Sequence, residues 1–261
     1  MPVSVLARTL RGIEWIARDE VRSRLGLERI ELGHRELRFS LPELVPELLE
    51  LGTAPTFDVT ASFLGKRNYN RFELEDAVAA SMGGMRVARD GAVSLRVHVV
   101  GEVATVAARI AWRPLHRRAY RVATVPGSVH PPLARALALL AGEPFLDPFC
   151  GAGTIPIEGA LAGLSTRGSD VDSRAVQAAR RNAAAAGLHI PFSVADAAGM
   201  APVECVVANP PWGKAVPATQ VDLQARRLVL LTFGPTGLDH IVHEQAVRVH
   251  GALATITVVE R

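Results

Sequence analysis

Cysteine is scarce in this chain of 261 residues, which contains only Cys150 and Cys205. Two cysteines cannot build the disulfide framework of a small secreted domain, so we expect a reducing, cytoplasmic setting. Long apolar runs are also absent, because Arg, Gly or Pro interrupts each one well before the ~20 residues that a membrane helix needs. The N-terminal stretch lacks the basic-then-apolar pattern of a secretory signal peptide, and no metal-ligand spacing occurs. We therefore expect neither a membrane anchor nor a metal site.

Lysine is nearly absent, and arginine supplies almost all of the positive charge. Hydrophobic residues make up 49% of the chain and charged residues 21%, which is the composition of a globular protein with room for roughly two domains. No acidic residue occurs between Glu102 and Glu143, and this interval contains Arg109, Arg113, Arg117, Arg118 and Arg121. Arginine can bind phosphate in a bidentate manner, so the basic interval favours a nucleic-acid partner. A solvated face of an arginine-rich chain is the alternative interpretation.

The first half of the chain has the pattern of two successive small α+β units, residues 1–52 and 53–112. In the first unit, periodicity predicts a strand at 3–6, a helix at 12–25, a hairpin at 28–41 turning at Gly33-His34, and a helix at 42–51. In the second unit, it predicts a strand at 57–61, a helix at 73–82 and a hairpin of 93–100 with 103–110. The periodicity then lapses around Pro114 and Pro126, so residues 113–127 are predicted to be a basic linker.

Residues 128–261 follow a different pattern, in which strands and helices alternate. Helices are predicted at 131–141, 155–164, 175–186 and 218–227, and strands at 145–146, 169–171, 191–196, 205–208 and 228–233. The strands are almost continuously apolar, which is typical of a parallel sheet covered by helices on both faces. The expected fold class of this half is therefore α/β, with a Rossmann-like sheet.

A glycine-rich loop, Asp147 to Thr154 (DPFCGAGT), follows the first predicted strand of this half. Gly151 and Gly153 would let the backbone approach a ligand at the carboxyl end of a strand, where doubly wound sheets bind their ligands. A dinucleotide fingerprint needs a third glycine where Pro156 stands, which argues against NAD. Because a carboxylate at Asp147 would repel a pyrophosphate and attract a cation, we expect a small, positively charged ligand.

Polar residues also mark the ends of the next three predicted strands. Asp170 lies 23 positions after Asp147, within the range at which an acid binds ribose hydroxyls. Asp196 is followed by Ala197 and is suitably placed to bond an exocyclic amine, and Asn209 ends the fourth strand. Each residue alone could be a helix cap or a turn residue. Four such residues in order, at strand ends, predict a single crevice.

Three segments, residues 147–154, 168–172 (GSDVD) and 209–213 (NPPWG), resemble the cofactor and catalytic motifs of S-adenosylmethionine-dependent methyltransferases. More narrowly, they are similar to the THUMP-domain group that methylates guanine N2 in RNA. Residues 113–121 resemble the linker of that group, and residues 65–71 lie in a unit similar to a small THUMP domain. The resemblance implies a ferredoxin-like unit at 1–52, a THUMP-like unit at 53–112, the linker at 113–127 and a class I methyltransferase domain at 128–261.

The resemblance also implies S-adenosyl-L-methionine as cofactor and RNA as partner, with tRNA preferred and rRNA as the other option. It places the methionine part at the glycine loop, the ribose at Asp170 and the adenine at Asp196 with Ala197. The implied cofactor residues are Asp147, Pro148, Cys150, Gly151, Gly153, Thr154, Asp170, Val171, Asp196 and Ala197. The implied RNA-binding residues are Lys66, Arg67, Arg71, Arg113, Arg117, Arg118 and Arg121.

The expected catalytic residues are Asn209, Pro210, Pro211 and Trp212. An amine on a purine is a poor nucleophile because its lone pair is delocalised into the ring. If the Asn209 side-chain oxygen and the Pro210 carbonyl accept the two amine protons, the nitrogen can pyramidalise and aim its lone pair at a methyl group. The two prolines would hold this backbone rigid, and Trp212 would stack on the base, which is worth ~1–3 kcal/mol. Orientation and charge placement, rather than a strong base, would then supply the rate.

Two other functions fit the same residues. Similar Asn-Pro-Pro-aromatic motifs serve adenine in DNA or RNA, or a glutamine amide in a protein. The third possibility is a catalytically inactive RNA-binding scaffold, because only 14 residues separate Gly213 from Leu228 and the base pocket would be short on one side.

Overall fold

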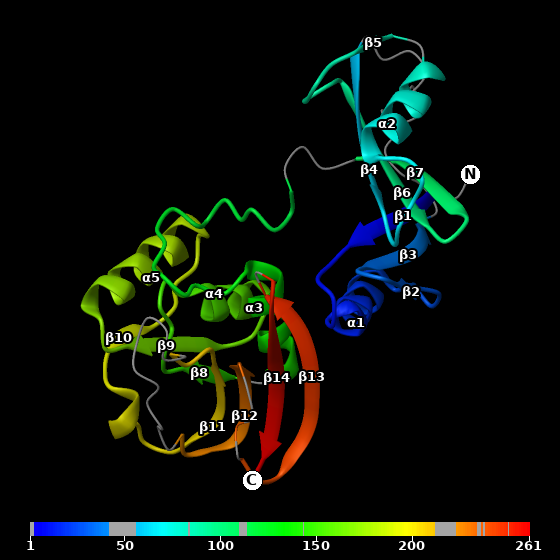
Figure 1. Cartoon of the computed structure of the whole chain (residues 1–261). Coiled ribbons are helices and arrows are strands. Elements are labelled where there is room, and N and C mark those ends of the chain that lie inside the picture. Colours follow the sequence, from blue (N-terminus) through cyan, green and yellow to red (C-terminus); the bar gives the residue numbers. More distant parts are fainter. Residues whose placement is uncertain are drawn as a thin grey trace. The chain divides into compact units, whose positions relative to one another are not determined.

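The structure is a computed structural model of the chain, shown in Figure 1. It describes residues 3–41, 56–82, 84–109, 114–142, 144–211, 223–233, 236, 238–249 and 251–261. The chain divides into two compact units, which are described separately: Met1–Leu6 with Ser40–Pro114, and Ala7–Phe39 with Leu115–Arg261. The helix predicted at 42–51 lies outside the described residues. In the part of the chain that the structure describes, no helix is both long and apolar enough to cross a membrane.

In its described residues, the first unit contains a four-stranded sheet in the order β5-β4-β6-β7 and the helix α2. Its elements are β4 (Thr56–Phe63), α2 (Arg71–Ala80), β5 (Met85–Arg86), β6 (Val93–Val100) and β7 (Val103–Ala108). The predicted hairpin is confirmed, because β6 and β7 pair antiparallel and Val100 faces Val103 across the turn. Helix α2 begins at Arg71 rather than at 73, because Asn70 caps it and forms a capping box with Glu73.

A smaller sheet, in the order β1-β3-β2, comes from the N-terminal residues. Its elements are β1 (Val3–Arg8), α1 (Glu14–Leu25), β2 (Glu31–Gly33) and β3 (Glu36–Leu41). The predicted hairpin is present, but Gly33 pairs with Glu36, so the turn falls one residue later than expected. Arg35 takes the left-handed conformation at this turn, with φ 61°. Ile13, which precedes α1, and Ile16 within it are buried in the main core of the second unit.

The second unit is built on a seven-stranded sheet in the order β10-β9-β8-β11-β12-β14-β13 (Figure 1). The strands are β8 (Phe145–Asp147), β9 (Thr166–Asp170), β10 (Phe192–Val194), β11 (Val203–Ala208), β12 (Ala225–Thr232), β13 (Ile241–Val249) and β14 (Ala252–Glu260). The first five strands in this order are parallel, whereas β14 pairs antiparallel with both β12 and β13. The α/β, Rossmann-like fold class is thus confirmed, and the sheet is mixed rather than purely parallel.

Three helices pack against this sheet: α3 (Pro131–Ala141), α4 (Thr154–Leu161) and α5 (Ser173–Ala185). Successive residues of β11 serve different cores, because Val207 joins the cluster of α1 and α3 whereas Val206 and Ala208 join a cluster on the other face. This burial on both faces explains the continuous apolar character of the strand. The helix predicted at 218–227 is wrong at its end, since β12 already begins at Ala225 and the residues before 223 lie outside the described part.

Candidate active site

The parallel strands bring the four predicted polar residues to one edge of the sheet. Asp147 ends β8, Asp170 ends β9, and Asp196 follows β10 by two residues. Asn209 comes directly after β11, which is the neighbour of β8 on its other side. All four strands run in the same direction, so their carboxyl ends share one edge. In doubly wound sheets this is the edge where ligands bind.

Asp147 is the most buried of these acids, with 1% of its surface exposed. Its Oδ1 accepts a hydrogen bond from the backbone N–H of Phe149 at 3.0 Å. Burial raises the pKa of Asp147 well above its ordinary value, and the nearby charge of Asp170 raises it further, while the Phe149 bond opposes the shift. A cation placed beside this carboxyl would favour its ionised form.

Asp170 is held in place by the backbone on both sides. Its Oδ2 accepts from the N–H of Gly151 at 2.9 Å, and its Oδ1 accepts from the N–H of Asp172 at 2.9 Å. The first of these bonds ties the end of β9 to the glycine loop. A carboxylate oxygen can accept more than one bond, so Asp170 retains capacity for a ligand hydroxyl.

The glycine loop is a tight turn that only glycine fits at two points. Gly151 and Gly153 have φ values of +52° and +78°, and the N–H of Gly153 donates to the Cys150 carbonyl at 2.7 Å. A Cβ on Gly153 would lie 2.9 Å from the Cβ of Ala179 on α5. The loop is therefore pressed against α5 at this residue, and α4 starts directly after it.

The remaining predicted cofactor residues differ in their exposure. Pro148 and Cys150 are buried, and burial followed by the charges of Asp147 and Asp170 raises the pKa of the Cys150 thiol, so this cysteine is a neutral packing residue. Thr154 is also buried, and its Oγ1 has no partner among the described residues. Val171 is 72% exposed at the edge of the sheet.

Asp196 stands on the other flank of this edge. It caps the short 3-10 helix Ala197–Gly199 by accepting from the N–H of Ala198 at 2.9 Å. Ala197 is buried, whereas Asp196 is exposed. Asp196 is therefore a helix cap, which was the alternative interpretation of each acid taken alone. A carboxylate that caps a helix can still accept a second hydrogen bond from a ligand.

The predicted catalytic motif is described only as far as Pro211. Asn209, Pro210 and Pro211 are half-buried, and Trp212 with Gly213 lies outside the described residues. The side-chain amide of Asn209 donates from Nδ2 to the carbonyl of Gly127 at 3.3 Å. This bond orients the amide and links the motif to the basic linker.

The linker is fastened to the sheet domain along residues 115–127, which we call the strap. Arg118 forms a bidentate ion pair with Glu158 of α4, with N···O distances of 2.7 and 3.2 Å. The hydroxyl of Tyr120 donates to the same carboxylate at 2.9 Å. Glu158 is 1% exposed. The burial of Tyr120 raises the pKa of its hydroxyl, and the charge of Glu158 raises it further. Arg118 thus has a structural role in this ion pair, and its contact with RNA stays a prediction.

The other predicted RNA-binding residues fall into three groups. Lys66, Arg71 and Arg117 are exposed, and Arg113 lies outside the described residues. Arg67 donates from Nη2 to the carbonyl of Gly101 at 2.6 Å, and Arg121 is half-buried in the strap. The exposed cations remain candidates for phosphate contacts, whereas Arg67 also braces the β6–β7 turn.

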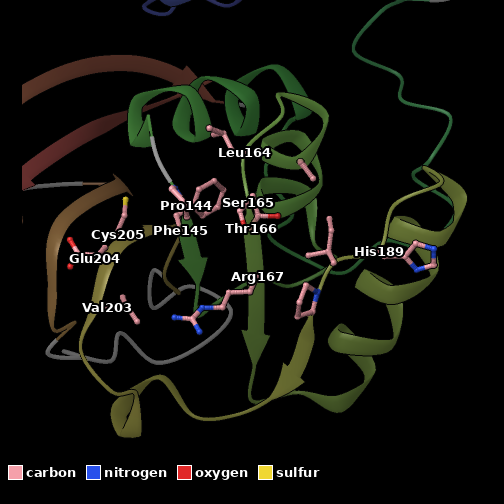
Figure 2. Close-up of a pocket in the computed structure, with 13 residues that line it drawn as sticks. Pro144, Phe145, Leu164, Ser165, Thr166, Arg167, His189, Val203, Glu204 and Cys205 are labelled. Atoms are coloured by element: carbon pink, nitrogen blue, oxygen red, sulfur yellow. The ribbon is translucent and has the colours of Figure 1, made fainter.

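A separate cavity of about 500 Å³ opens at the opposite edge of the sheet. Figure 2 shows lining residues at the amino ends of the strands, among them Phe145, Thr166 and Val203. Arg167 and His189 also line the cavity. Ligands of open α/β sheets bind outside the carboxyl ends instead. We therefore place the candidate site at the edge that carries Asp147 and Asn209.

Three residues that organise the site were not predicted from the sequence: Tyr120, Glu158 and Asn182. Glu158 offered a signal, because a lone acid in the apolar stretch of α4 needs a partner if it is buried. Asn182 offered a weaker one, as a polar residue on the inner face of an alanine-rich helix. Neither feature of the sequence identifies the residue to which Glu158 or Asn182 bonds.

The fold and this edge define the chain as a class I methyltransferase in architecture. Residues 118–224 match the family model described as "RMKL-like, methyltransferase domain". The chain is similar to the tRNA (guanine(6)-N2)-methyltransferase of Thermus thermophilus, with 37% identity over 184 residues. That alignment covers 63% of this chain and 53% of the relative.

The chain is also similar to the ribosomal RNA large subunit methyltransferase K/L of Shewanella baltica, with 28% identity over 60% of this chain and 31% of the relative. The chain thus spans about half of the first relative and about a third of the second. Among solved structures, TrmN from Thermus thermophilus matches with a TM-score of 0.81 and 26% identity, covering 100% of both chains. A predicted N6-adenine-specific DNA methylase from Listeria monocytogenes shares the fold, with a TM-score of 0.75 and 18% identity over 99% of this chain and 96% of that one.

Proposed function

We propose that this protein is an S-adenosylmethionine-dependent RNA methyltransferase that acts on the exocyclic N2 amine of a guanosine in tRNA. The observation that carries the proposal is the shared edge of Asp147, Asp170, Asp196 and Asn209. A relative named for guanine-N2 methylation of tRNA supports the substrate, and one named for rRNA keeps ribosomal RNA as the second option.

The residues of the edge fit S-adenosylmethionine by their chemistry. When bound, this cofactor supplies an electrophilic methyl group on a positively charged sulfonium. Asp147 offers a buried carboxyl whose ionised form a cation would stabilise. The left-handed glycines Gly151 and Gly153 form a tight turn whose backbone would border the cofactor. Asp170 would accept from the ribose hydroxyls, and Asp196 would accept from the adenine amine.

Asn209 and Pro210 would act on the target amine. We assign the Asn209 side-chain oxygen and the Pro210 carbonyl as acceptors for its two protons, which frees the nitrogen lone pair. The Gly127 bond sets the orientation of the amide before substrate arrives, and the two prolines remove backbone freedom. Such preorganised acceptors lower the barrier without a strong base. Trp212 is assigned to stack on the guanine.

The N-terminal part is assigned to grip the RNA. We propose a ferredoxin-like unit at 1–52, a THUMP-like unit at 53–112 and the linker at 113–127. The exposed cations Lys66, Arg71 and Arg117 are the residues that would contact phosphates. We further propose a cytoplasmic setting, in keeping with the buried, free thiols of Cys150 and Cys205.

The decisive test compares modified nucleosides from a deletion strain with those of the wild type by mass spectrometry. We expect N2-methylguanosine to fall in the tRNA fraction and to return when the wild-type gene, but not the Asn209→Ala variant, is supplied. A loss confined to rRNA would change the substrate, and a loss of N6-methyladenosine would favour the adenine alternative. If no nucleoside changes and calorimetry detects no binding of S-adenosylmethionine, the scaffold alternative holds.

A further inference from the structure

Asn182 on α5 is completely buried and makes three hydrogen bonds that join two distant segments. Its Oδ1 accepts from the N–H of Ala123 at 2.9 Å, and its Nδ2 donates to the carbonyl of Ala123 at 2.9 Å. Nδ2 also donates to the carbonyl of Ala152 at 2.9 Å. Ala123 belongs to the strap, whereas Ala152 lies between the two glycines of the loop. One side-chain amide thus bonds both the strap and the glycine loop and fixes their relative position.

The strap continues from this point along the candidate site. Val125 lies against the glycine loop, because a Cβ on Gly151 would come within 3.3 Å of its side chain. Two residues further on, the carbonyl of Gly127 accepts from the Asn209 amide at 3.3 Å. A segment of five residues, 123–127, therefore connects the cofactor loop to the catalytic motif.

We propose that Asn182 is a positioning residue for methyl transfer, which locks the strap to the glycine loop so that the strap forms one wall of the cofactor site. This inference rests on the proposed function. The strap ends are fixed independently, at Glu158 by Arg118 and at Gly127 by Asn209, so Asn182 controls the stretch between them. Binding of the cofactor at the glycine loop would then order the strap, and a loosened strap would lower the affinity of the loop for the cofactor.

The sharpest variant is Asn182→Asp, because it keeps the size of the side chain and changes its donors. The carboxylate still accepts from the Ala123 N–H, but it places an oxygen against the carbonyls of Ala123 and Ala152. A protonated Asp has a single O–H and can satisfy only one of the two carbonyls. The ionised side chain therefore loses both donated bonds, and the protonated one keeps only one of them, so the link between strap and loop is weakened in either protonation state.

The matched control is Arg180→Gln on the same helix. Arg180 donates from Nη2 to the carbonyl of Phe192 at 2.6 Å, so its loss also removes a side-chain bond that anchors α5. This contact goes to β10 and involves neither the strap nor the glycine loop. Comparison of the two variants separates a general loosening of α5 from the specific effect.

The experiment titrates S-adenosylmethionine into full-length wild type, Asn182→Asp and Arg180→Gln by calorimetry, and measures hydrogen exchange of the strap with and without cofactor. We expect Asn182→Asp to bind at least tenfold more weakly and Arg180→Gln to stay within twofold of wild type. Cofactor should slow exchange at residues 118–127 in wild type and in Arg180→Gln, but not in Asn182→Asp. Should Asn182→Asp fail to fold, Ala123→Pro removes the strap's donor while leaving α5 intact, and the same tenfold loss is expected.

The outcomes separate the two proposals. If wild type binds no S-adenosylmethionine, the proposed function fails. If wild type binds it but the folded variants bind equally well, or the strap does not respond to cofactor in wild type, the positioning role of Asn182 is overturned and the proposed function stands.

Discussion

The ion pair between Arg118 and Glu158 provides a quantitative test of how the strap is held. Glu158 is 2% exposed in its side chain, whereas the side chain of Arg118 is 30% exposed. Removal of one partner from a buried pair costs ~3–5 kcal/mol, because the other charge stays buried without compensation. In Arg118→Met the stranded charge is the buried carboxylate, whose remaining partner among the described residues is the Tyr120 hydroxyl, so we expect a loss of about 3 kcal/mol.

Glu158→Gln should cost less, about 1–2 kcal/mol, because the amide oxygen still accepts one bond and Arg118 can turn toward water. The double variant should cost less than Arg118→Met alone, since no unpaired charge remains. Urea unfolding would be followed by the fluorescence of Trp15, which packs beside His243 in the second unit, with Trp112 and Trp212 replaced by Phe. If the double variant loses the sum of the two single losses, or if Arg118→Met loses less than about 0.5 kcal/mol, the pair is no stronger than a surface salt bridge and the reasoning is refuted.

The arrangement of the candidate site could be predicted because it depends on the order and direction of strands. Asp147 and Asn209 each follow an apolar run and Asp170 ends the strand between two helices, and in a parallel sheet such positions meet at one edge. The functional roles of these residues stay predictions, as does the division into four parts. The hairpin of β6 and β7 could be predicted equally well, since Gly101 marks its turn between two segments in which apolar and polar residues alternate.

The C-terminal strands were harder to predict because their pairing is not local. Residues 225–227 were predicted to be helical, but they lie in β12, and Arg227 donates from Nη2 to the carbonyl of Leu140 on α3 at 2.9 Å. Tertiary contacts of this kind override local propensity. The hairpin of β13 and β14 was not predicted, since β13 is an edge strand with only one buried residue, Val247. The pairing of Ala123 with Asn182 spans 59 positions and leaves no periodic signal.

Three further variants test the site itself. Asn209→Ala should abolish methyl transfer to tRNA while S-adenosylmethionine still binds in calorimetry, and equal loss of both would contradict the assigned role. Gly153→Ala should cost ~1–3 kcal/mol in urea unfolding from its left-handed backbone alone, and more from the Ala179 contact, whereas Gly142→Ala, with nothing within 4 Å, should show the backbone cost only. Asp147 has a raised pKa in the folded state, so it binds more protons there than in the unfolded state. Its contribution to stability therefore falls as pH rises from the ordinary pKa of an aspartate toward the raised pKa. A cationic cofactor favours the ionised carboxyl, so across the same window binding should release a proton and tighten as pH rises. Calorimetry in buffers of different ionisation enthalpy measures that proton directly, and Asp147→Asn should abolish its release; a wild type whose binding enthalpy is independent of the buffer would show that Asp147 does not face the cation.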